Sequence, residues 1–390
     1  MPVELREETP AETGRASAVR PVPILLTARE LHLGGIERDI AQIALHIDRA
    51  RFEPHVASYS AEGMRREELH AAGVPLLDLP VTSLKSPSVV SAALKLRRYI
   101  RDHGIELVHA YDSSAAFAVP VARALGVPAV LGSTLGHRSL LDPRTRRLLR
   151  WTDKIVDAVV VNCEAMRRHM RDEERVPGER IELCYNGVDT GVFCPRRGRI
   201  IEPAAGGAFV LGAVCVLRPE KSLDLLQEAF ARARRLRPGM KLRIVGSGPE
   251  LAKLQANSRR LGIEDGCEFA PATREVAAAL REFDIYVSSS RSEAFSNTIL
   301  EAMASGCCVV GSRVGGTPEL IGNDERGLLF EAGNAADLAA KLIELAENQG
   351  LRRALGRRAA EFAAETFTIE IAARRMAEIY ETILRRKALR

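Results

Sequence analysis

Aromatic side chains are scarce in this sequence, because phenylalanine, tyrosine and tryptophan together make up only 5% of its 390 residues. No stretch combines aromatic with basic residues into a platform on which bases could stack, and the formal net charge is only +5. The composition therefore gives no reason to expect a nucleic-acid partner. Residues 1–20 are polar and predict a disordered tail.

Long apolar runs are missing as well. The longest, residues 115–132, contains Arg123 and two prolines, which excludes a membrane-spanning helix there. The seven cysteines are odd in number and follow no disulfide or metal-ligand spacing, which favours buried thiols in a reducing compartment. Because no signal peptide is visible, we expect a cytoplasmic protein, either free or resting on the inner face of the membrane.

Short β-branched runs alternate with helical patterns along nearly the whole chain, and 46% of the residues are apolar. This alternation predicts an α/β protein with parallel strands and crossover helices, and the length favours two domains. Residues 193–207 are rich in proline, glycine and charge and predict a linker. The strands expected before that linker are residues 22–27, 54–58, 75–79, 107–110, 129–132, 158–162 and 181–184.

One stretch of the second half carries the strongest chemical signal. Residues 288–306 read S-S-S-R-S-E-A-F-S-N-T-I-L-E-A-M-A-S-G and lie between two apolar runs. The pattern predicts strand, loop, helix and strand, with the helix from Asn297 to Ser305 and Ser296 as its N-cap. Glu293 then lies in the loop at the carboxyl end of a strand, and Glu301 lies one turn into the helix. Ligands of open α/β sheets bind at that edge, next to helix N-termini.

Two shorter strings suit binding of a phosphate, and a third is weak evidence for a nucleotide. Gly34 and Gly35 precede a helix, so a ligand can approach the backbone amides closely. Lys221 follows a strand and opens the next helix. Gly246 and Gly248 form a glycine-rich turn between a strand and a helix, although a short G-x-G alone says little about a nucleotide.

Taken together, the strings resemble the retaining glycosyltransferases of family 4, the glycogen-synthase-like group with the GT-B fold that is also called glycosyl transferases group 1. The paired glutamates and their flanks resemble the family's glutamate motif. Four further strings match family segments: G-G-x-E-R at 34–38, N-G-V-D at 186–189, L-R-P-E-K at 217–221 and G-G-x-P-E at 315–319.

The resemblance implies two Rossmann-like domains with parallel sheets that face each other across a cleft. Residues 21–192 would form the acceptor-side domain and residues 208–367 the nucleotide-sugar-binding domain, with the linker at 193–207 between them. Residues 368–390 would form a helix that crosses back to the first domain.

The implied reaction moves a sugar from a nucleotide-sugar donor to a hydroxyl of a glycan, lipid-linked or small-molecule acceptor, with retention at the anomeric carbon. The implied catalytic residues are Glu293, which contacts the donor sugar, Lys221, which binds the diphosphate, and His109. The implied donor-binding residues are Gly34, Gly35, Arg218, Lys221, Gly246, Gly248, Pro271, Thr273, Glu293, Ala294, Phe295, Ser296, Asn297 and Glu301, the last on the ribose hydroxyls. The nucleotide sugar is a co-substrate, and we expect neither a cofactor nor a metal.

Some alternatives stay open. The family's arginine position is Val216 here, so Arg218 either replaces that arginine or points away. Either His109 or Tyr111 faces the substrate. A nucleotide-sugar epimerase of the same fold and a non-catalytic nucleotide-sugar-binding protein remain alternative functions. The sequence names neither the sugar, nor the base among UDP, GDP and ADP, nor the acceptor, nor the oligomeric state.

A basic amphipathic stretch, residues 138–154, has two interpretations. Its arginines could be solvated on a surface helix whose leucines face the core. Alternatively they could bind an anionic membrane surface as a peripheral contact. The basic residues in question are Arg144, Arg146, Arg147 and Arg150.

Overall fold

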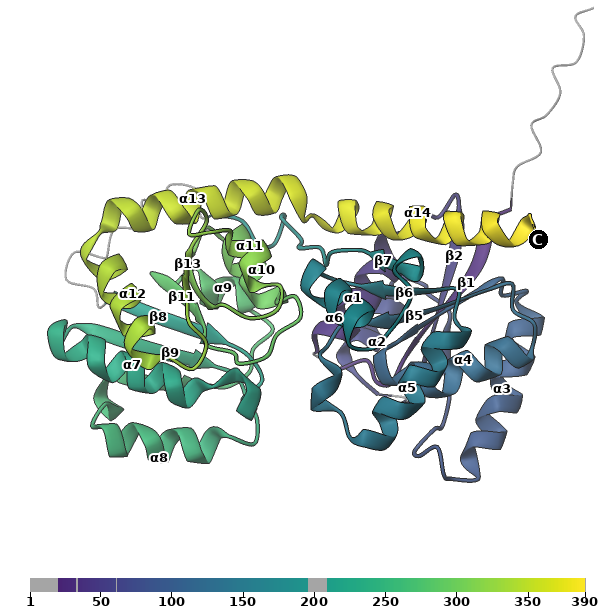
Figure 1. Ribbon diagram of the computed structural model, residues 1–390, viewed down its shortest axis with the longest axis horizontal. Coiled ribbons are helices and arrows are strands. Elements are labelled where there is room, and N and C mark those ends of the chain that lie inside the picture. Colours follow the sequence, from purple (N-terminus) through teal and green to yellow (C-terminus); the bar gives the residue numbers. More distant parts are fainter. Residues whose placement is uncertain (1–19, 33, 61, 196–208, 390) are drawn as a thin grey trace, which may run out of the picture.

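The computed structural model describes residues 20–32, 34–60, 62–195 and 209–389 (Figure 1). The expected tail at 1–20, apart from Arg20, and the expected linker at 193–207, apart from residues 193–195, lie outside the described residues. Two parallel sheets with helices on both faces form two Rossmann-like domains, which confirms the predicted fold class.

The first sheet has seven strands in the order β3-β2-β1-β4-β5-β6-β7. The strands are β1 (Val22–Ala28), β2 (Phe52–Ser58), β3 (Leu76–Asp78), β4 (Leu107–Tyr111), β5 (Ala129–Thr134), β6 (Ala158–Val161) and β7 (Ile181–Leu183). Each strand predicted in this half is present, and its ends differ from the predicted ones by no more than two residues. The helices are α1 (Gly35–His46), α2 (Met64–Ala71), α3 (Ser88–Asp102), α4 (Ala115–Ala124), α5 (Pro143–Ile155) and α6 (Glu164–Asp172).

The second sheet has six strands in the order β10-β9-β8-β11-β12-β13. The strands are β8 (Phe209–Val214), β9 (Met240–Val245), β10 (Cys267–Ala270), β11 (Ile285–Ser288), β12 (Cys308–Ser312) and β13 (Leu328–Phe330). The helices are α7 (Leu223–Leu236), α8 (Leu251–Leu261), α9 (Val276–Leu280), α10 (Asn297–Ala304), α11 (Thr317–Ile321), α12 (Ala335–Glu347) and α13 (Gln349–Thr366).

Alternation along buried strands sends side chains into separate cores. In β4, Val108 and Ala110 pack with α3 and α4 on one face of the sheet. Leu107 and Tyr111 pack on the other face, with α1 and the last helix, α14 (Ile369–Ala388). Because both faces are covered, most residues of the strands are apolar, as is typical of parallel sheets.

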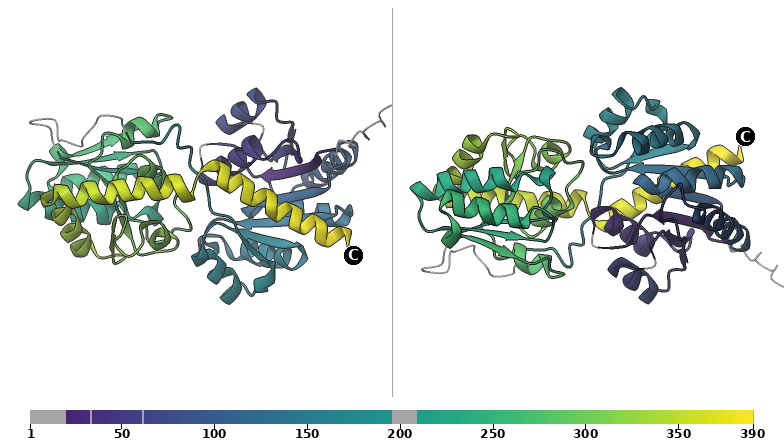
Figure 2. Two further views of the ribbon diagram at one scale, coloured as in Figure 1. Left: turned by 90° about the horizontal axis from the view of Figure 1, so that it is seen from above. Right: turned by 90° about the horizontal axis from the view of Figure 1, so that it is seen from below.

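The last two helices connect the domains (Figure 2). Helix α13 packs on the second sheet, and α14 lies on the first, where the ring of Tyr380 is fully buried. Thr368 N-caps α14, and the chain crosses from one domain to the other beside Val188, whose N–H donates to the carbonyl of Phe367 at 2.8 Å. The N-G-V-D turn and the start of α14 therefore lie together between the domains.

Candidate functional site

The loop that follows β11 brings Glu293 beside Lys221. Lys221 ends a short 3₁₀ turn after β8, the neighbour of β11 in the sheet. Its Nζ lies 2.7 Å from Oε2 of Glu293, and the hydroxyl of Ser290 donates to the same oxygen at 3.0 Å. Burial lowers the pKa of Lys221, but the carboxylate of Glu293 outweighs it, so the pKa of Lys221 is raised overall. The site therefore holds a lysine cation at neutral pH.

The same loop leads into the N-terminus of α10. Ser296 is the N-cap, as predicted, and its hydroxyl accepts from the N–H of Ile299 at 3.4 Å. The Phe295 ring is buried against Tyr185 and Phe367, with ring centroids 5.3 and 5.4 Å away, so only its backbone can face a ligand. Free N–H groups at a helix N-terminus beside a lysine cation suit an anion such as a phosphate.

Two glycines support the Glu293 loop from behind, and neither was among the predicted site residues. Gly315 has a φ of +52°, and a Cβ there would lie 1.7 Å from the carbonyl oxygen of Glu293. The N–H of Gly316 donates to the carbonyl of Ala294 at 2.6 Å. The G-G-x-P-E string therefore sets the position of the Glu293 backbone, since no larger residue fits.

The turns after β9 and β10 lie next to each other at the same sheet edge. Ser247 lies in the turn that Gly246 and Gly248 form. Its hydroxyl accepts a hydrogen bond at 3.3 Å from the N–H of Ala272. Ala272 belongs to the loop that contains Pro271 and Thr273. A Cβ on either glycine would overlap the backbone of residues 215–217, at 1.9 and 2.5 Å. Close packing within the domain thus explains both glycines, and their contact with a donor stays a prediction.

The first domain contributes the N-terminus of α1. Gly34 is the N-cap residue, and the side chain of Glu37 folds back over it, where a Cβ would collide with the carboxylate. Burial raises the pKa of Glu37, and the positive charge of Arg218 counteracts part of that rise. Arg218 is exposed, and its effect on the pKa of Glu37 indicates that it lies near the first domain. A Cβ on Gly35 would lie 3.4 Å from Nδ2 of Asn297, so the N-termini of α1 and α10 face each other.

Asn297 connects the domains through its side chain. Its Nδ2 donates to Oδ1 of Asp39 at 3.1 Å, and its Oδ1 accepts from Nδ2 of Asn186 at 2.8 Å. Glu301, one turn further along α10, forms an ion pair with Arg38 of α1 and is only 2% exposed. The contact of Glu301 with ribose hydroxyls stays a prediction, because α1 covers its carboxylate in this arrangement.

Glu319, in the same G-G-x-P-E string, is a second connection between the domains. Its carboxylate accepts from the N–H groups of Glu164 and Ala165 at 2.9 and 2.8 Å, at the N-terminus of α6. The hydroxyl of Tyr185 donates to it at 3.1 Å. A carboxylate at a helix N-terminus is stabilised by the helix dipole, so this contact holds the second domain against the first.

His109 is placed differently from the prediction. It is fully buried, and its ring nitrogens lie 2.8 Å from the hydroxyl of Tyr380 and 2.7 Å from the hydroxyl of Ser133. Burial lowers its pKa to about 3, so the ring is neutral. The prediction of His109 as a catalytic residue is contradicted by this placement, because α14 covers the ring and both nitrogens are used inside the domain.

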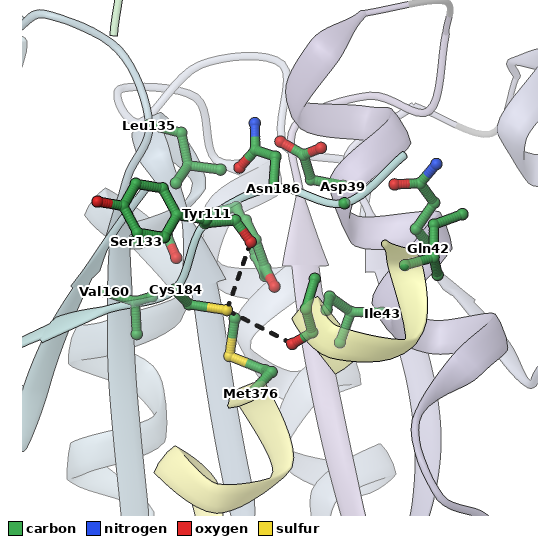
Figure 3. Close-up of a pocket in the computed structure, with 14 residues that line it drawn as sticks. Asp39, Gln42, Ile43, Tyr111, Ser133, Leu135, Val160, Cys184, Asn186 and Met376 are labelled. Atoms are coloured by element: carbon green, nitrogen blue, oxygen red, sulfur yellow. Dashed lines mark hydrogen bonds between the residues drawn. The ribbon is translucent and has the colours of Figure 1, made fainter. Parts of the chain in front are cut away.

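Tyr111 lies on the same side of β4 and is 3% exposed. It lines a cavity of about 30 Å³ between the first sheet and α14, together with Asp39 and Cys184 (Figure 3). Burial raises the pKa of Asp39 to about 7, although the hydrogen bond from Asn297 counteracts part of the rise. Neither of the two aromatic candidates of β4 therefore reaches an open site.

The basic stretch on α5 is only partly solvated. Arg146 and Arg150 both bind Glu174, at 2.9 and 2.5 Å, and the Glu174 side chain is fully buried. Arg144 and Arg147 are exposed and point to solvent. Arg146 and Arg150 therefore pair with a carboxylate just after α6, although the side chain of Arg150 is still 42% exposed. Contact of the four arginines with an anionic membrane stays a prediction.

Within residues 20–32, 34–60, 62–195 and 209–389, no three histidine, cysteine, aspartate or glutamate side chains gather where they could hold a metal ion. No helix in the same part of the chain is both long and apolar enough to cross a membrane.

Comparison with known families and proteins agrees with this geometry. The family model of glycosyl transferases group 1 matches residues 199–362, and that of glycosyltransferase family 4 matches residues 33–192. A GDP-mannose-dependent alpha-(1-6)-phosphatidylinositol monomannoside mannosyltransferase of Mycobacterium tuberculosis is 31% identical over 311 residues, which is 73% of this chain and 78% of that protein. The chain belongs to the group 1 glycosyltransferases of family 4.

Two other relatives are similar over shorter parts of their length. The N-acetyl-alpha-D-glucosaminyl L-malate synthase of Bacillus anthracis is 30% identical over 247 residues, or 63% of this chain. The D-inositol 3-phosphate glycosyltransferase of Segniliparus rotundus is 27% identical over 295 residues, or 73% of this chain. The chain spans somewhat less than two thirds of both relatives, at 64% and 63% of their lengths.

Solved structures share the fold, which is GT-B. A glycosyltransferase from Rickettsia africae superposes with a TM-score of 0.81 over 93% of this chain and 99% of that one, at 19% identity. Anabaena HepE in complex with UDP-glucose also gives 0.81, over 92% and 99% of the two chains, at 19% identity. At 19% identity these similarities show the fold alone, and they establish that this chain has the GT-B architecture.

Proposed function

We propose that this protein transfers a sugar from a nucleotide-sugar donor to a hydroxyl of a glycan, lipid-linked or small-molecule acceptor, with retention at the anomeric carbon. The observation that carries the proposal is the Lys221–Glu293 pair, which lies at the carboxyl edge of the second sheet beside the N-terminus of α10. Family membership and the sugar-transferring relatives support it.

The cationic residues and Glu293 have different roles in the proposed reaction. Transfer requires that the negative charge that develops on the departing diphosphate be stabilised by groups already in place. Lys221 and the free N–H groups of α10 and α1 are such groups, and Arg218 is a second, more exposed cation. Glu293 would orient the donor sugar, since its carboxylate is fixed by Lys221 and Ser290. We propose that this cationic site works without a divalent metal; activity lost with EDTA and restored by magnesium would contradict that.

A two-step experiment tests the function. The first step measures thermal shifts with UDP, GDP and ADP in the presence of EDTA, and the second measures turnover with the matching nucleotide sugars. Glu293→Gln keeps the shape of the side chain but loses its charge, so transfer should fall while the fold persists. Glu347→Gln, at an exposed residue paired with Arg237, is the control and should keep full activity. Full activity of the Glu293 variant would refute the proposal.

One observation keeps a non-catalytic alternative in view. Val216 stands at the position where the family has an arginine. Its side chain is 40% exposed, but a valine supplies no charge to a diphosphate. A protein that only binds a nucleotide sugar would show a thermal shift with a diphosphate but no turnover. A nucleotide-sugar epimerase would change the donor sugar without an acceptor. Analysis of the products therefore separates the binding protein and the epimerase from a transferase.

Peripheral contact with an anionic membrane remains a further part of the proposal. Arg144 and Arg147 are exposed basic residues of α5, and Trp151 on the same helix is 47% exposed. Sedimentation with anionic vesicles should depend on these residues, and Arg144→Glu with Arg147→Glu should abolish it. Unchanged sedimentation of that double variant would remove the contact.

A further inference from the structure

Helices α1 and α10 contact each other across the two domains through two pairs of polar side chains. On α1, Arg38 and Asp39 are adjacent, and on α10, Asn297 and Glu301 are four residues apart and therefore lie on one side of the helix. Asn297 donates to Asp39, while Arg38 forms the ion pair with Glu301. Two of the residues that the family motif assigns to the donor thus bind the other domain.

Glu301 is poorly provided with hydrogen bonds. Its side chain is only 3% exposed, and apart from the contact of the Arg38 guanidinium with Oε1, no described residue donates a hydrogen bond to either carboxylate oxygen. The ion pair with Arg38 is the contact that compensates its charge. A carboxylate offers about four acceptor positions, and leaving them unused away from water is costly. The carboxylate of Glu301 can therefore accept further hydrogen bonds, for example from the hydroxyls of a ribose.

Arg38 is better placed to move than Glu301. Its side chain is 21% exposed, against 3% for Glu301, so the guanidinium can reach water by rotating about its own side chain. Burial lowers the pKa of Arg38 to about 10, with a further contribution from the positive charge of Arg65. Arg38 is therefore charged at neutral pH, yet its surroundings favour that charge less than water does.

We propose that Arg38 is a positioning residue that holds Glu301 until the ribose hydroxyls of a nucleotide replace it. The two partners exclude each other, because a side chain that is 3% exposed leaves no room for a ribose while Arg38 stays in contact. Asp39 and Asn297 keep α1 against α10 while the exchange takes place. The inference rests on the proposed function, and it takes the contact between Glu301 and ribose from the resemblance to the family.

The test is nucleotide affinity in a variant that removes the competitor. Arg38→Met should bind the diphosphate that the wild type prefers among UDP, GDP and ADP at least about fivefold more tightly, as measured by calorimetry. Arg51→Met is the matched control, because Arg51 pairs with Glu381 in the same domain away from the site; its affinity should equal that of the wild type. Unchanged or weaker binding by Arg38→Met would overturn the inference.

A second variant and a second ligand guard against an effect of misfolding. Arg38→Lys keeps the charge but not the planar fork, so its affinity should fall between those of the wild type and Arg38→Met. The matching 2′-deoxynucleoside diphosphate lacks a hydroxyl for Glu301, so the gain in Arg38→Met should shrink with it. An equal gain with both ligands would mean a general loosening of the domains and would contradict the exchange.

The outcomes also separate the inference from the proposed function. Sugar transfer by the wild type, together with unchanged affinity of Arg38→Met, would overturn the inference alone. Tighter binding by Arg38→Met without transfer from any nucleotide sugar would uphold the exchange and refute transfer. Failure of the wild type to bind any of the three diphosphates would overturn both.

Discussion

Replacement of Lys221 by methionine should separate the catalytic role of the lysine from its role in stability. Methionine keeps much of the length and apolar volume of the side chain but removes the charge. Glu293, 15% exposed, would then lose the cation 2.7 Å from its Oε2. Because the pair is neither fully exposed nor fully buried, we expect the free energy of unfolding to fall by about 1–3 kcal/mol.

Activity should fall far more than stability. Removing one group that stabilises developing charge typically lowers kcat by about 10²–10³-fold, or about 2.7–4 kcal/mol of barrier. If Lys221 stabilises the departing diphosphate, Lys221→Met should lose activity in this range at a temperature where it remains folded. Lys253→Met is the control, since Lys253 pairs with Glu250 at 2.8 Å but is 65% exposed.

The pH dependence of stability gives an independent check. The pKa of Lys221 in the folded protein is raised above its ordinary value of 10.5. A raised lysine pKa stabilises the folded state fully below the unfolded value, and that contribution is lost as pH rises through the folded value. The difference in unfolding free energy between wild type and Lys221→Met should thus be constant from about pH 6 to about pH 9 and shrink only in strong alkali.

Denaturant unfolding across pH and steady-state turnover with the nucleotide sugar measure the two effects. Turnover of Lys221→Met within about threefold of the wild type would refute the assignment, because threefold is less than 1 kcal/mol of barrier. A stability difference that disappears between about pH 6 and 9 would show that another group, not Lys221, holds the Glu293 carboxylate.

Two further predictions concern the supports of the site. Gly315→Ala should lower kcat at least about tenfold, because its Cβ would overlap the carbonyl of Glu293. Gly333→Ala is the control, since Gly333 has a φ of +82° in open space. It should lower the free energy of unfolding by only about 1–2 kcal/mol and leave turnover unchanged. Equal kcat values would contradict the first. Tyr380→Phe should lower the free energy of unfolding by about 1–3 kcal/mol, since His109 loses a buried partner. An unchanged denaturation midpoint would contradict it.

Local patterns predicted most of the secondary structure around the site. Ser296 caps α10 as expected, because Ser, Thr, Asp and Asn before a helical pattern satisfy its free N–H groups wherever the helix lies. The apolar runs before and after this loop form β11 and β12 for a similarly local reason. The nearness of Lys221 and Glu293, by contrast, depends on the pairing of β8 with β11, two strands that are not consecutive in the chain.

The roles of charged and polar side chains outside that loop were less predictable. Arg38 and Glu319 stand in strings that resemble family motifs, so their presence was a signal, but which partner each would meet was not. Arg146 and Arg150 have the spacing of a solvated helix face, yet both bind Glu174. An ion pair depends on the distance between two side chains, which sequence separation does not determine.

The sequence by itself determined the α/β alternation, the two parallel sheets and the glutamate loop, because periodicity and capping act over a few residues. Only the tertiary structure decided what each buried polar group faces. His109 lies in the middle of β4 and points beneath α14, a helix more than 250 residues later in the chain. Glu301 has the expected place on α10 but is covered by α1. Burial is set by which elements pack together, and that is a property of the whole chain.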